Sequence, residues 1–248
     1  MIKVFRLVFL NIKGIAFYFK SFLILKRQKG KDLNFPFGRI FPIFWERFSQ
    51  SGKMSGHYFH QDLHIAKRIY NNNPKKHLDI GSRIDGFIAH LAVFRKVEVL
   101  DIRSLDSKVE NIVFKQEDLM QPQVSLYDYC DSISSLHAIE HFGLGRYGDQ
   151  VDYFGYLKAL NNIAKILRKG GVFYFSVPIG PQRIEFNAHR VFSLSYLITL
   201  LEKDYDIVDF SFVDDKGDLN TSVQLNQKDI IKNYGCHYGC GIFELIKK

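Results

Sequence analysis

The sequence predicts an α/β domain in which a mostly parallel sheet is covered by helices on both faces, preceded by a helical extension. Short apolar segments alternate with amphipathic ones along residues 57–248, and only brief connections separate them. The chain has 248 residues, of which 46% are hydrophobic and 15% aromatic, so a sizeable core can form. No uncharged apolar run reaches about twenty residues, so no simple membrane-spanning helix is expected.

The helices and strands of this domain are expected in a regular order. Amphipathic segments predict helices over residues 57–71, 86–94, 151–168 and 193–203. Apolar runs predict seven strands, over residues 77–81, 97–101, 111–115, 131–136, 172–177, 206–213 and 241–246. Pro74 ends the first helix because a proline restricts the residue before it. Gly170 and Gly171 are expected to end the third helix, and Pro178 the fifth strand.

The excess positive charge lies at the N-terminus. The net charge is +8, and residues 1–31 hold eight basic side chains and no acidic one, so residues 32–248 are balanced. This distribution does not favour a nucleic-acid partner, which would call for basic residues across the domain. The chain therefore divides into a basic amphipathic helical extension (1–31), a connector (32–56) rich in glycine, proline and aromatic residues, and the domain (57–248).

Four basic residues of the extension, Arg6, Lys13, Lys20 and Arg27, recur every seven positions and form one stripe on a helix. Apolar residues flank this stripe, so the helix could lie on an anionic membrane surface. The alternative is a helix packed on the domain or in a dimer contact, and the oligomeric state is left open. Membrane contact would place the protein on the inner membrane face.

The cysteine and histidine content predicts a cytoplasmic protein without a bound metal. Three cysteines are too few for a disulfide framework and suit a reducing compartment. Two clusters of metal-ligand residue types occur, His57 with His60 and His64, and Cys236 with His237 and Cys240. Neither cluster supplies the convergent donors of a closed zinc site, so no metal is expected.

Three successive strand ends carry residues that suit a nucleoside-bearing cofactor. Gly81 follows the first strand, where a glycine lets the backbone approach a ligand and the next helix offers free N–H groups. Asp101 ends the second strand and could accept hydrogen bonds from both ribose hydroxyls. Asp118 follows the third strand and could accept one from an adenine amine. In an open parallel sheet these ends lie at one edge, where ligands bind.

Residues 57–213 resemble the class I S-adenosylmethionine-dependent methyltransferases. The matching segments, in the order of that family's motifs, are residues 78–82, Asp101, 117–119, 135–141 and 167–172. The resemblance implies a Rossmann-like class I methyltransferase fold and S-adenosyl-L-methionine as cofactor. The residues that it implies for cofactor binding are Asp79, Gly81, Ser82, Gly86, Asp101, Ile102, Asp118, Leu119 and Leu136. The dense glycine run of the family is replaced here by Gly-Ser-Arg-Ile-Asp-Gly over residues 81–86.

Three strings, at residues 56–63, 140–149 and 186–190, resemble a poorly characterised methyltransferase-like bacterial family found in surface-polysaccharide gene clusters. That resemblance implies a glycan acceptor, either a small molecule or lipid-linked. The expected activity is O-methylation of a capsule or O-antigen precursor sugar, or of its phosphate or phosphoramidate decoration. The alternative is a non-catalytic binding or assembly protein of the glycan machinery.

Methylation of a sugar hydroxyl requires a base, whereas an anionic acceptor requires cations. His141 is the first candidate base and His137 the second, since both follow the fourth strand; each could instead be a histidine satisfied by hydrogen bonds in the core. The candidate substrate-binding residues are His60, Asp62, Arg83, Arg146, Tyr147, Asn187, His189 and Arg190. For Arg146 and Arg190 the alternative is a structural ion pair with Asp149 or Glu185.

Overall fold

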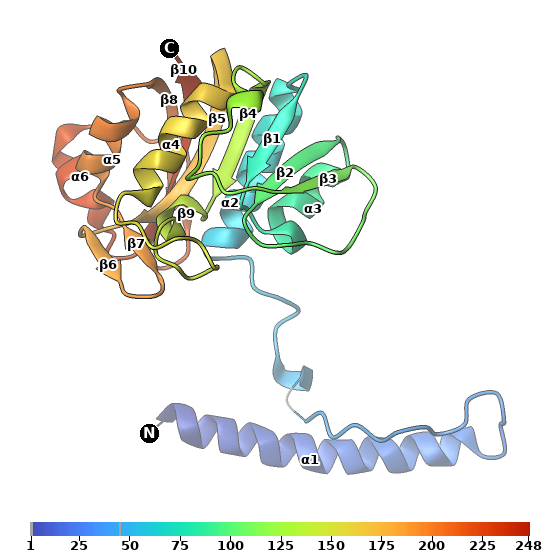
Figure 1. The fold of residues 1–248 in the computed structure, drawn as a ribbon. Helices are drawn as coiled ribbons and strands as arrows, with labels where there is room; N and C mark the ends of the chain where they lie inside the picture. Colours follow the sequence, from blue (N-terminus) through green and yellow to red (C-terminus); the bar gives the residue numbers. More distant parts are fainter. Residues whose placement is uncertain (1, 45) are drawn as a thin grey trace. The chain divides into compact units, whose positions relative to one another are not determined.

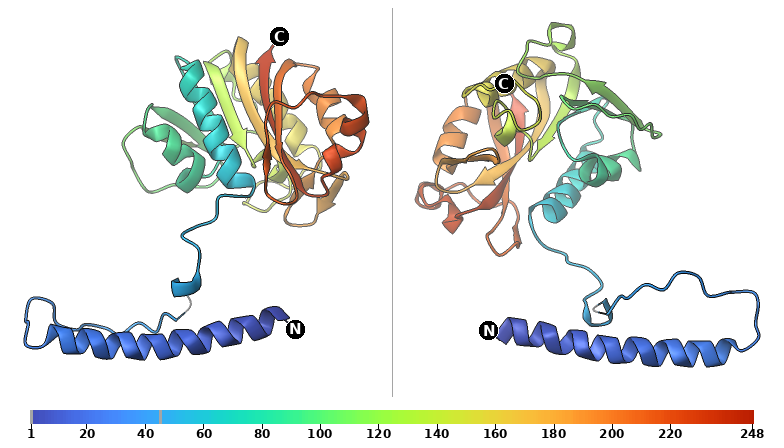
Figure 2. Two further views of the ribbon diagram at one scale, coloured as in Figure 1. Left: turned by 180° about the vertical axis from the view of Figure 1, so that it is seen from behind. Right: turned by 60° about the horizontal axis from the view of Figure 1, so that its bottom comes forward.

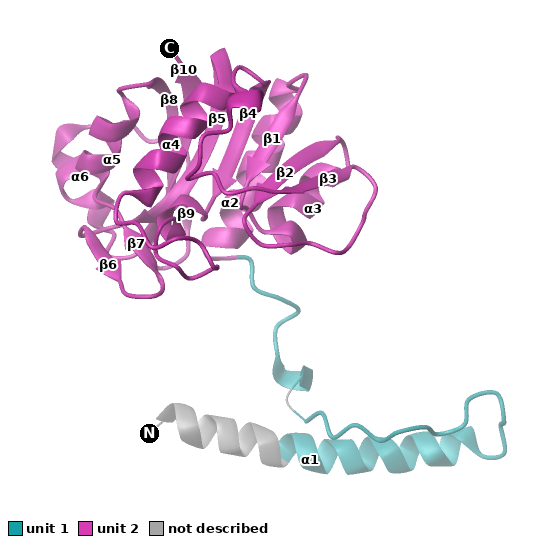
Figure 3. Cartoon of the chain, in the orientation of Figure 1, with its two compact units in different colours: residues 1–54 teal, residues 55–248 magenta. Residues whose placement is uncertain are grey.

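The computed structural model describes residues 2–44 and 46–248, with the backbone alone for residues 2–12. The chain forms two compact units, residues 1–54 and residues 55–248 (Figure 3).

The first unit consists of the long helix α1 (Ile2–Lys29) and a returning segment with one short 3-10 helix, η1 (Glu46–Phe48). The returning chain packs along α1, where the rings of Tyr18 and Phe44 meet edge to face at 5.3 Å. Many apolar side chains on the described part of α1 nevertheless remain exposed, among them Phe19 and Leu23. The side chain of Arg6, part of the predicted basic stripe, lies outside the described residues. Among the described helices none is long and apolar enough to cross a membrane.

The second unit is built on one eight-stranded sheet with the order β3-β2-β1-β4-β5-β10-β8-β9 (Figure 1). Its strands are β1 (His77–Ile80), β2 (Val97–Asp101), β3 (Ile112–Gln116), β4 (Cys130–Leu136), β5 (Leu167–Ile179), β8 (Tyr205–Val213), β9 (Leu219–Asn220) and β10 (Gly239–Lys247). The five strands from β3 to β5 are parallel, whereas β10 is antiparallel to both β5 and β8. A separate hairpin joins β6 (Arg183–Glu185) and β7 (His189–Val191).

Helices cover both faces of this sheet, as the sequence predicted. On one face lie α2 (His57–Asn72), the π-helix η2 (Ile84–Ile88) and α3 (Ala89–Ala92); on the other lie α4 (Gly155–Ile166), α5 (Leu194–Leu201) and α6 (Gln227–Ile231). Short 3-10 turns form η3 (Val124–Leu126), η4 (Ile139–His141) and η5 (Asn233–Gly235). Each helical layer buries its own apolar cluster against the sheet, and the view from behind shows α2 lying along its face (Figure 2). The predicted fold class is therefore confirmed.

Three details of the sequence prediction are wrong. Pro178 does not end the fifth strand, because β5 runs through it to Ile179 and pairs there with the start of β10. The sheet has eight strands rather than seven, because a turn with Gly217 at φ 90° brings the two-residue strand β9 back onto β8. The third helix of the prediction, 151–168, begins later, at Gly155, and ends earlier, at Ile166. It ends there because Leu167 pairs with Cys130 of β4, so the glycine pair lies inside the long strand β5.

Candidate functional site

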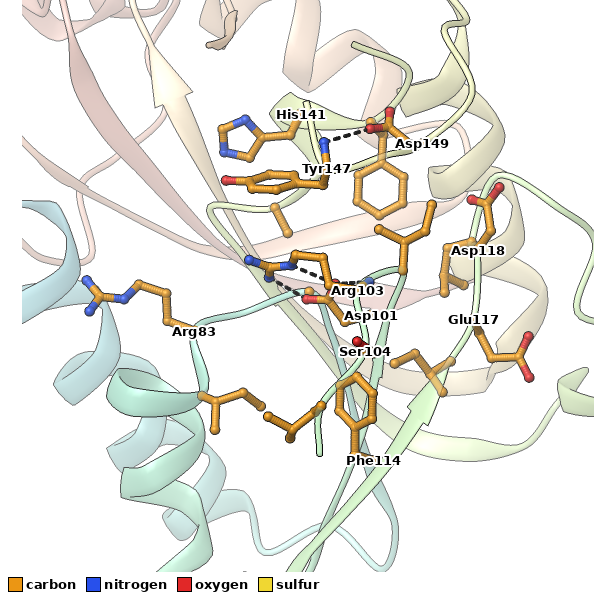
Figure 4. A pocket seen from close by; sticks show the side chains of 18 of the residues that line it. Arg83, Asp101, Arg103, Ser104, Phe114, Glu117, Asp118, His141, Tyr147 and Asp149 are labelled. Atoms are coloured by element: carbon orange, nitrogen blue, oxygen red, sulfur yellow. Dashed lines mark hydrogen bonds and ion pairs between the residues drawn. The ribbon is translucent and has the colours of Figure 1, made fainter. Parts of the chain in front are cut away.

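A cavity of about 540 Å³ opens at the carboxyl ends of β1, β2, β3 and β4 (Figure 4). Parallel strands place their carboxyl ends at one edge, so segments distant in sequence meet there. The lining residues are Tyr58, Gly81, Arg83, Ile84, Asp85, Leu100, Asp101, Ile102, Arg103, Ser104, Leu105, Phe114, Glu117, Asp118, Leu119, His137, Ala138, His141, Phe142, Tyr147 and Asp149. The ends of the first three strands thus border one space, as the sequence predicted.

The turn after β1 is held by a buried hydrogen-bond network. Asp79 accepts hydrogen bonds from the backbone N–H of Ser82 at 3.0 Å and from its hydroxyl at 2.7 Å. The hydroxyl of Ser134 donates to the same carboxylate at 2.5 Å. Gly81 has φ 70°, and a Cβ there would lie 3.0 Å from the Cβ of Ala138. The glycine therefore gives this turn both its left-handed backbone and its close approach to the loop after β4.

The carboxylate of Asp101 lies at the cavity, and Arg103 holds it. The guanidinium of Arg103 donates to the two carboxylate oxygens at 2.9 and 2.5 Å, and the ring of Tyr147 lies 4.6 Å from it. The side chain of Arg103 is 50% exposed and that of Asp101 is 11% exposed. A ligand hydroxyl that approached Asp101 would have to share or replace this pair. The sequence reasoning missed Arg103, and no signal in the chain marks its pairing two residues away.

The third strand end contributes Asp118 and Leu119, which both line the cavity. Asp118 also accepts the backbone N–H of Met120 at 2.9 Å, which shapes the turn after β3. Figure 4 shows Asp118 and Glu117 on the side of the cavity opposite Arg83.

The predicted cofactor residues divide into two groups. Five of them line the cavity: Gly81, Asp101, Ile102, Asp118 and Leu119. The other four do not line it, and they stand behind the turn as support: Asp79, Ser82, Gly86 and Leu136. Ser82 accepts the backbone N–H of Leu136 at 3.0 Å, and a Cβ at position 86 would lie 2.8 Å from Asp62.

His141 lines the cavity with a ring nitrogen available for chemistry. Its Nδ1 lies 2.6 Å from the carbonyl oxygen of Ala188; because a carbonyl only accepts, Nδ1 carries the proton and Nε2 is the basic nitrogen. Burial lowers the pKa of His141 below its ordinary value, although nearby Glu140 raises it. The ring of Tyr147 meets that of His141 edge to face at 5.3 Å (Figure 4). His141 is therefore neutral at neutral pH and can accept a proton.

His137 lines the same cavity in a different environment. Its Nδ1 lies 2.7 Å from a carboxylate oxygen of buried Glu140, and its backbone has φ 51°, which is rare for a residue with a side chain. Burial lowers its pKa, but Cys240 and Glu140 together raise the pKa well above its ordinary value. A histidine held in its charged form is a poorer base than neutral His141.

Of the predicted substrate-binding residues, Arg83 and Tyr147 line the cavity and six others do not: His60, Asp62, Arg146, Asn187, His189 and Arg190. Arg83 pairs with Asp85 at 3.1 Å. The buried guanidinium of Arg190 donates to three backbone carbonyls, those of residues 140, 142 and 153, and so braces the loop around His141. Asp149 also braces this loop, by accepting backbone N–H groups of Gly143, Gly145 and Tyr147. A substrate role for the six residues outside the lining stays a prediction.

The chain is similar to solved structures of methyltransferases. One is a Burkholderia thailandensis 1,6-didemethyltoxoflavin-N1-methyltransferase with bound 1,6-didemethyltoxoflavin and S-adenosylhomocysteine. The sequences are 14% identical, the match covers 94% of this chain and 89% of that chain, and the TM-score is 0.54. Another is the N-methyltransferase NodS from Bradyrhizobium japonicum WM9 in complex with S-adenosylhomocysteine. Here the sequences are 15% identical, the match covers 91% of this chain and 97% of that chain, and the TM-score is 0.51. The [4+2]-cyclase SpnF is also similar, with 11% sequence identity over 69% of this chain and 75% of that chain and a TM-score of 0.50. At such identities these likenesses establish the fold alone.

The sequence profile of a family described as "Caenorhabditis protein of unknown function, DUF268" matches residues 92–237, more than half of the chain. No curated protein sequence matches this chain. The chain belongs to the DUF268 family and has the fold of class I S-adenosylmethionine-dependent methyltransferases.

Proposed function

We propose that this DUF268 protein binds S-adenosyl-L-methionine and transfers its methyl group to an acceptor hydroxyl. One observation carries the proposal: the ends of β1, β2 and β3 border a single cavity, with Gly81, Asp101 and Asp118 in its lining. Two relatives of the same fold were crystallised with S-adenosylhomocysteine. A carboxylate at the second strand end suits ribose hydroxyls, because charged hydrogen bonds are strong in a partly buried site.

His141 supports the acceptor chemistry. Methyl transfer from a sulfonium is an in-line displacement, so the protein mainly aligns donor and acceptor. A hydroxyl acceptor must also lose its proton, and the unprotonated Nε2 of His141 can receive it at the cavity wall. His137 was the second candidate base, and its raised pKa makes it the weaker one.

For the acceptor we propose a precursor sugar of a surface polysaccharide, free or lipid-linked. The aromatic side chains of Tyr58, Phe142 and Tyr147 in the lining offer flat apolar surfaces on which a sugar ring can lie. Arg83 and Arg103 in the same lining would suit a phosphate or phosphoramidate decoration. The glycan assignment rests on the sequence resemblance together with this lining.

We place the protein in the cytoplasm, with α1 on the anionic inner face of the membrane. Apolar side chains and cations coexist on the described part of that helix, as in helices that lie at a lipid surface. Flotation of the full chain with phosphatidylglycerol vesicles, absent with phosphatidylcholine vesicles and after deletion of residues 1–31, is the expected result. Equal flotation on both lipids would contradict the electrostatic part of this proposal.

The decisive experiment is calorimetric titration of the full chain with S-adenosylhomocysteine, followed by incubation with methyl-labelled S-adenosyl-L-methionine. We expect one bound molecule per chain, and label in a lipid-linked or water-soluble glycan fraction. A chain that binds no S-adenosylhomocysteine would refute the cofactor assignment. Binding without label in any fraction would leave the second candidate, a non-catalytic binding protein.

The pairing of Arg103 with Asp101 favours that second candidate, because the carboxylate meant for ribose already has a partner. The likeness to a [4+2]-cyclase likewise shows that this fold hosts other activities.

A further inference from the structure

Three residues from distant parts of the chain bring metal-ligand atoms together beside the cavity. They are His57 at the start of α2, His137 after β4, and Cys240 near the start of β10. One ligand atom from each, two ring nitrogens and a sulfur, lie within 4.8 Å of one another. The antiparallel direction of β10 explains the convergence, because its first residues lie at the edge where β4 ends.

A second observation points to a missing ligand at this place. The Nε2 atom of His137 is buried and has no hydrogen-bond partner, and the same is true of Oε2 of Glu140. The other ring nitrogen of His137 lies 2.7 Å from Glu140. Buried polar atoms without partners are costly, and a histidine that is held by a carboxylate through one nitrogen is the usual arrangement of a metal ligand.

We propose that His57, His137 and Cys240 bind a divalent transition-metal ion, for which Zn²⁺ is the best match. Two imidazoles and one thiolate are donors that Zn²⁺ prefers over Mg²⁺ or Ca²⁺. Binding displaces two protons into water, that of the Cys240 thiol and that on Nε2 of charged His137, and the sulfur then bonds to the metal as a thiolate and Nε2 as a neutral imidazole nitrogen. Three protein donors leave one coordination position for water or an oxygen of a bound molecule, as in catalytic zinc sites.

The distances between the ligand atoms have to shorten by up to about 1–1.5 Å for them to share one ion. Zn–N bonds of about 2.0–2.1 Å and Zn–S bonds of about 2.3 Å imply separations of roughly 3.3–3.6 Å between the two nitrogens and the sulfur in a tetrahedron. His57 is half-buried and is the first residue of its helix, so its side chain can rotate by the remaining distance. The rings of His57 and His137 are nearly parallel, with centroids 5.2 Å apart and planes 7° apart, so the ring of His57 has to turn before the lone pairs of both nitrogens point at one ion. A bound ion would also compensate the buried charge of Glu140.

Cys240 is held by its surroundings, whereas His57 has one hydrogen bond that a turn of its ring would have to break. The ring of His57 makes a hydrogen bond with the backbone of Tyr238. The carboxylate of Asp215 accepts the backbone N–H groups of His237 and Tyr238, each at 2.9 Å, and so fixes the turn that leads to Cys240. The thiol of Cys240 makes long contacts with Oε1 of Gln61, at 3.5 Å, and with the carbonyl oxygen of Gly241, at 3.8 Å, and it also interacts with His137.

The test is metal binding by the full chain after removal of metals with a chelator under reducing conditions. Zn²⁺ alone is titrated against a coloured competing chelator, and we expect one bound ion per chain. His57→Ala and Cys240→Ser should each weaken Zn²⁺ binding more than about 100-fold, and Glu140→Gln by about 10–100-fold, the range for residues that orient a ligand. Co²⁺ in place of Zn²⁺ should give a thiolate-to-metal absorption band that Cys240→Ser abolishes.

Two matched controls lie close by in the chain. His64→Ala changes another histidine of α2, and Cys236→Ser changes another buried cysteine of the same region; both should leave Zn²⁺ affinity and the Co²⁺ band unchanged. Circular dichroism checks that each variant is folded. If Cys240→Ser does not fold, the result for His57→Ala decides, because His57 is only half-buried and its substitution should leave the fold intact. Failure of the wild-type chain to bind Zn²⁺, or equal affinity in His57→Ala, would overturn the proposal. Metal binding is measured without cofactor or acceptor, so this outcome is independent of the proposed methyl transfer.

Discussion

The two sides of the cavity are built in different ways. The cofactor side is made from short segments at the ends of β1, β2 and β3, each close in sequence to the strand that positions it. The side that carries His137 and His141 depends on residues far away in the chain: Ala188 accepts from His141, and Cys240 lies beside His137. Local motifs therefore define the first side, whereas the completed fold defines the second.

Substitution of His141 should have the largest effect and should be confined to the acceptor side. We expect His141→Ala to lower turnover by about 10²–10⁴-fold, because the base that takes the hydroxyl proton is lost. Affinity for S-adenosylhomocysteine should stay unchanged. Initial rates and calorimetry on the same preparation measure the two effects. A rate near that of the wild type would indicate an acceptor that is already anionic.

Substitution of Asp101 should act on the cofactor side alone. Asp101→Ala should weaken S-adenosylhomocysteine binding by about 1–3 kcal/mol, or roughly 5–150-fold, through the loss of charged hydrogen bonds to ribose. Asp106→Ala is the matched control, since Asp106 is exposed in the same loop and does not line the cavity. Calorimetry on both variants decides, and an unchanged affinity in Asp101→Ala would remove the ribose assignment.

Strand β1, which leads to the cofactor side, should be sensitive to acid at its first residue. His77 lies between the hydroxyls of Ser132 and Ser134, at 2.8 and 3.0 Å, and burial lowers its pKa from 6.5 to about 3. A depressed folded-state pKa gives stability that is complete above about pH 6.5 and is lost as the pH falls toward 3, by up to about 1.4 kcal/mol per unit. His77→Gln should therefore show a flatter fall in unfolding free energy between pH 6.5 and 4.5.

Urea unfolding at several pH values measures this difference. Burial raises the pKa of Asp79 to about 7, so its contribution has the opposite sign and falls as the pH rises from about 4 to 7. Asp79 is present in both proteins, so the difference between them reports on His77. Parallel curves for wild type and His77→Gln would show that His77 is not neutral in the fold.

The smallest effect should come from Arg103. Arg103→Ala frees the carboxylate of Asp101, so S-adenosylhomocysteine should bind about two- to five-fold more tightly, the range for a pair with one partner half exposed. Calorimetric titration measures it, with Arg83→Ala as a comparison from the same cavity. Weaker binding in Arg103→Ala would mean that the guanidinium itself contacts the cofactor.

The contrast between the two sides also sets what the sequence could predict. The strand ends and the residues Gly81, Asp101 and Asp118 follow from local pattern, because a parallel sheet brings such ends to one edge. The pairing of Arg103 with Asp101 depends on the side-chain conformation of Arg103, which no sequence pattern indicates. Strand β9 and the early end of α4 were missed because tertiary pairing decided them.

The metal-ligand residues show the same limit more sharply. The sequence contains two clusters of metal-ligand residue types, one around His57 and one around Cys236. Neither cluster alone supplies enough ligand atoms for a metal ion. The fold takes His57 from the first and Cys240 from the second and adds His137 from between them. Spacing along the chain could not show this combination, because it arises from the antiparallel insertion of β10 between β5 and β8.

The left-handed backbone of His137 has a consequence for protein engineering. Glycine or asparagine adopts this conformation more easily than other residues, and the penalty for a side chain there is about 1–2 kcal/mol. A selection for thermal tolerance would therefore favour replacement of His137, and the same change would remove the imidazole from the cavity wall. At position 137 thermal stability and the chemistry of the cavity favour different amino acids, so stabilising substitutions should be sought at other positions.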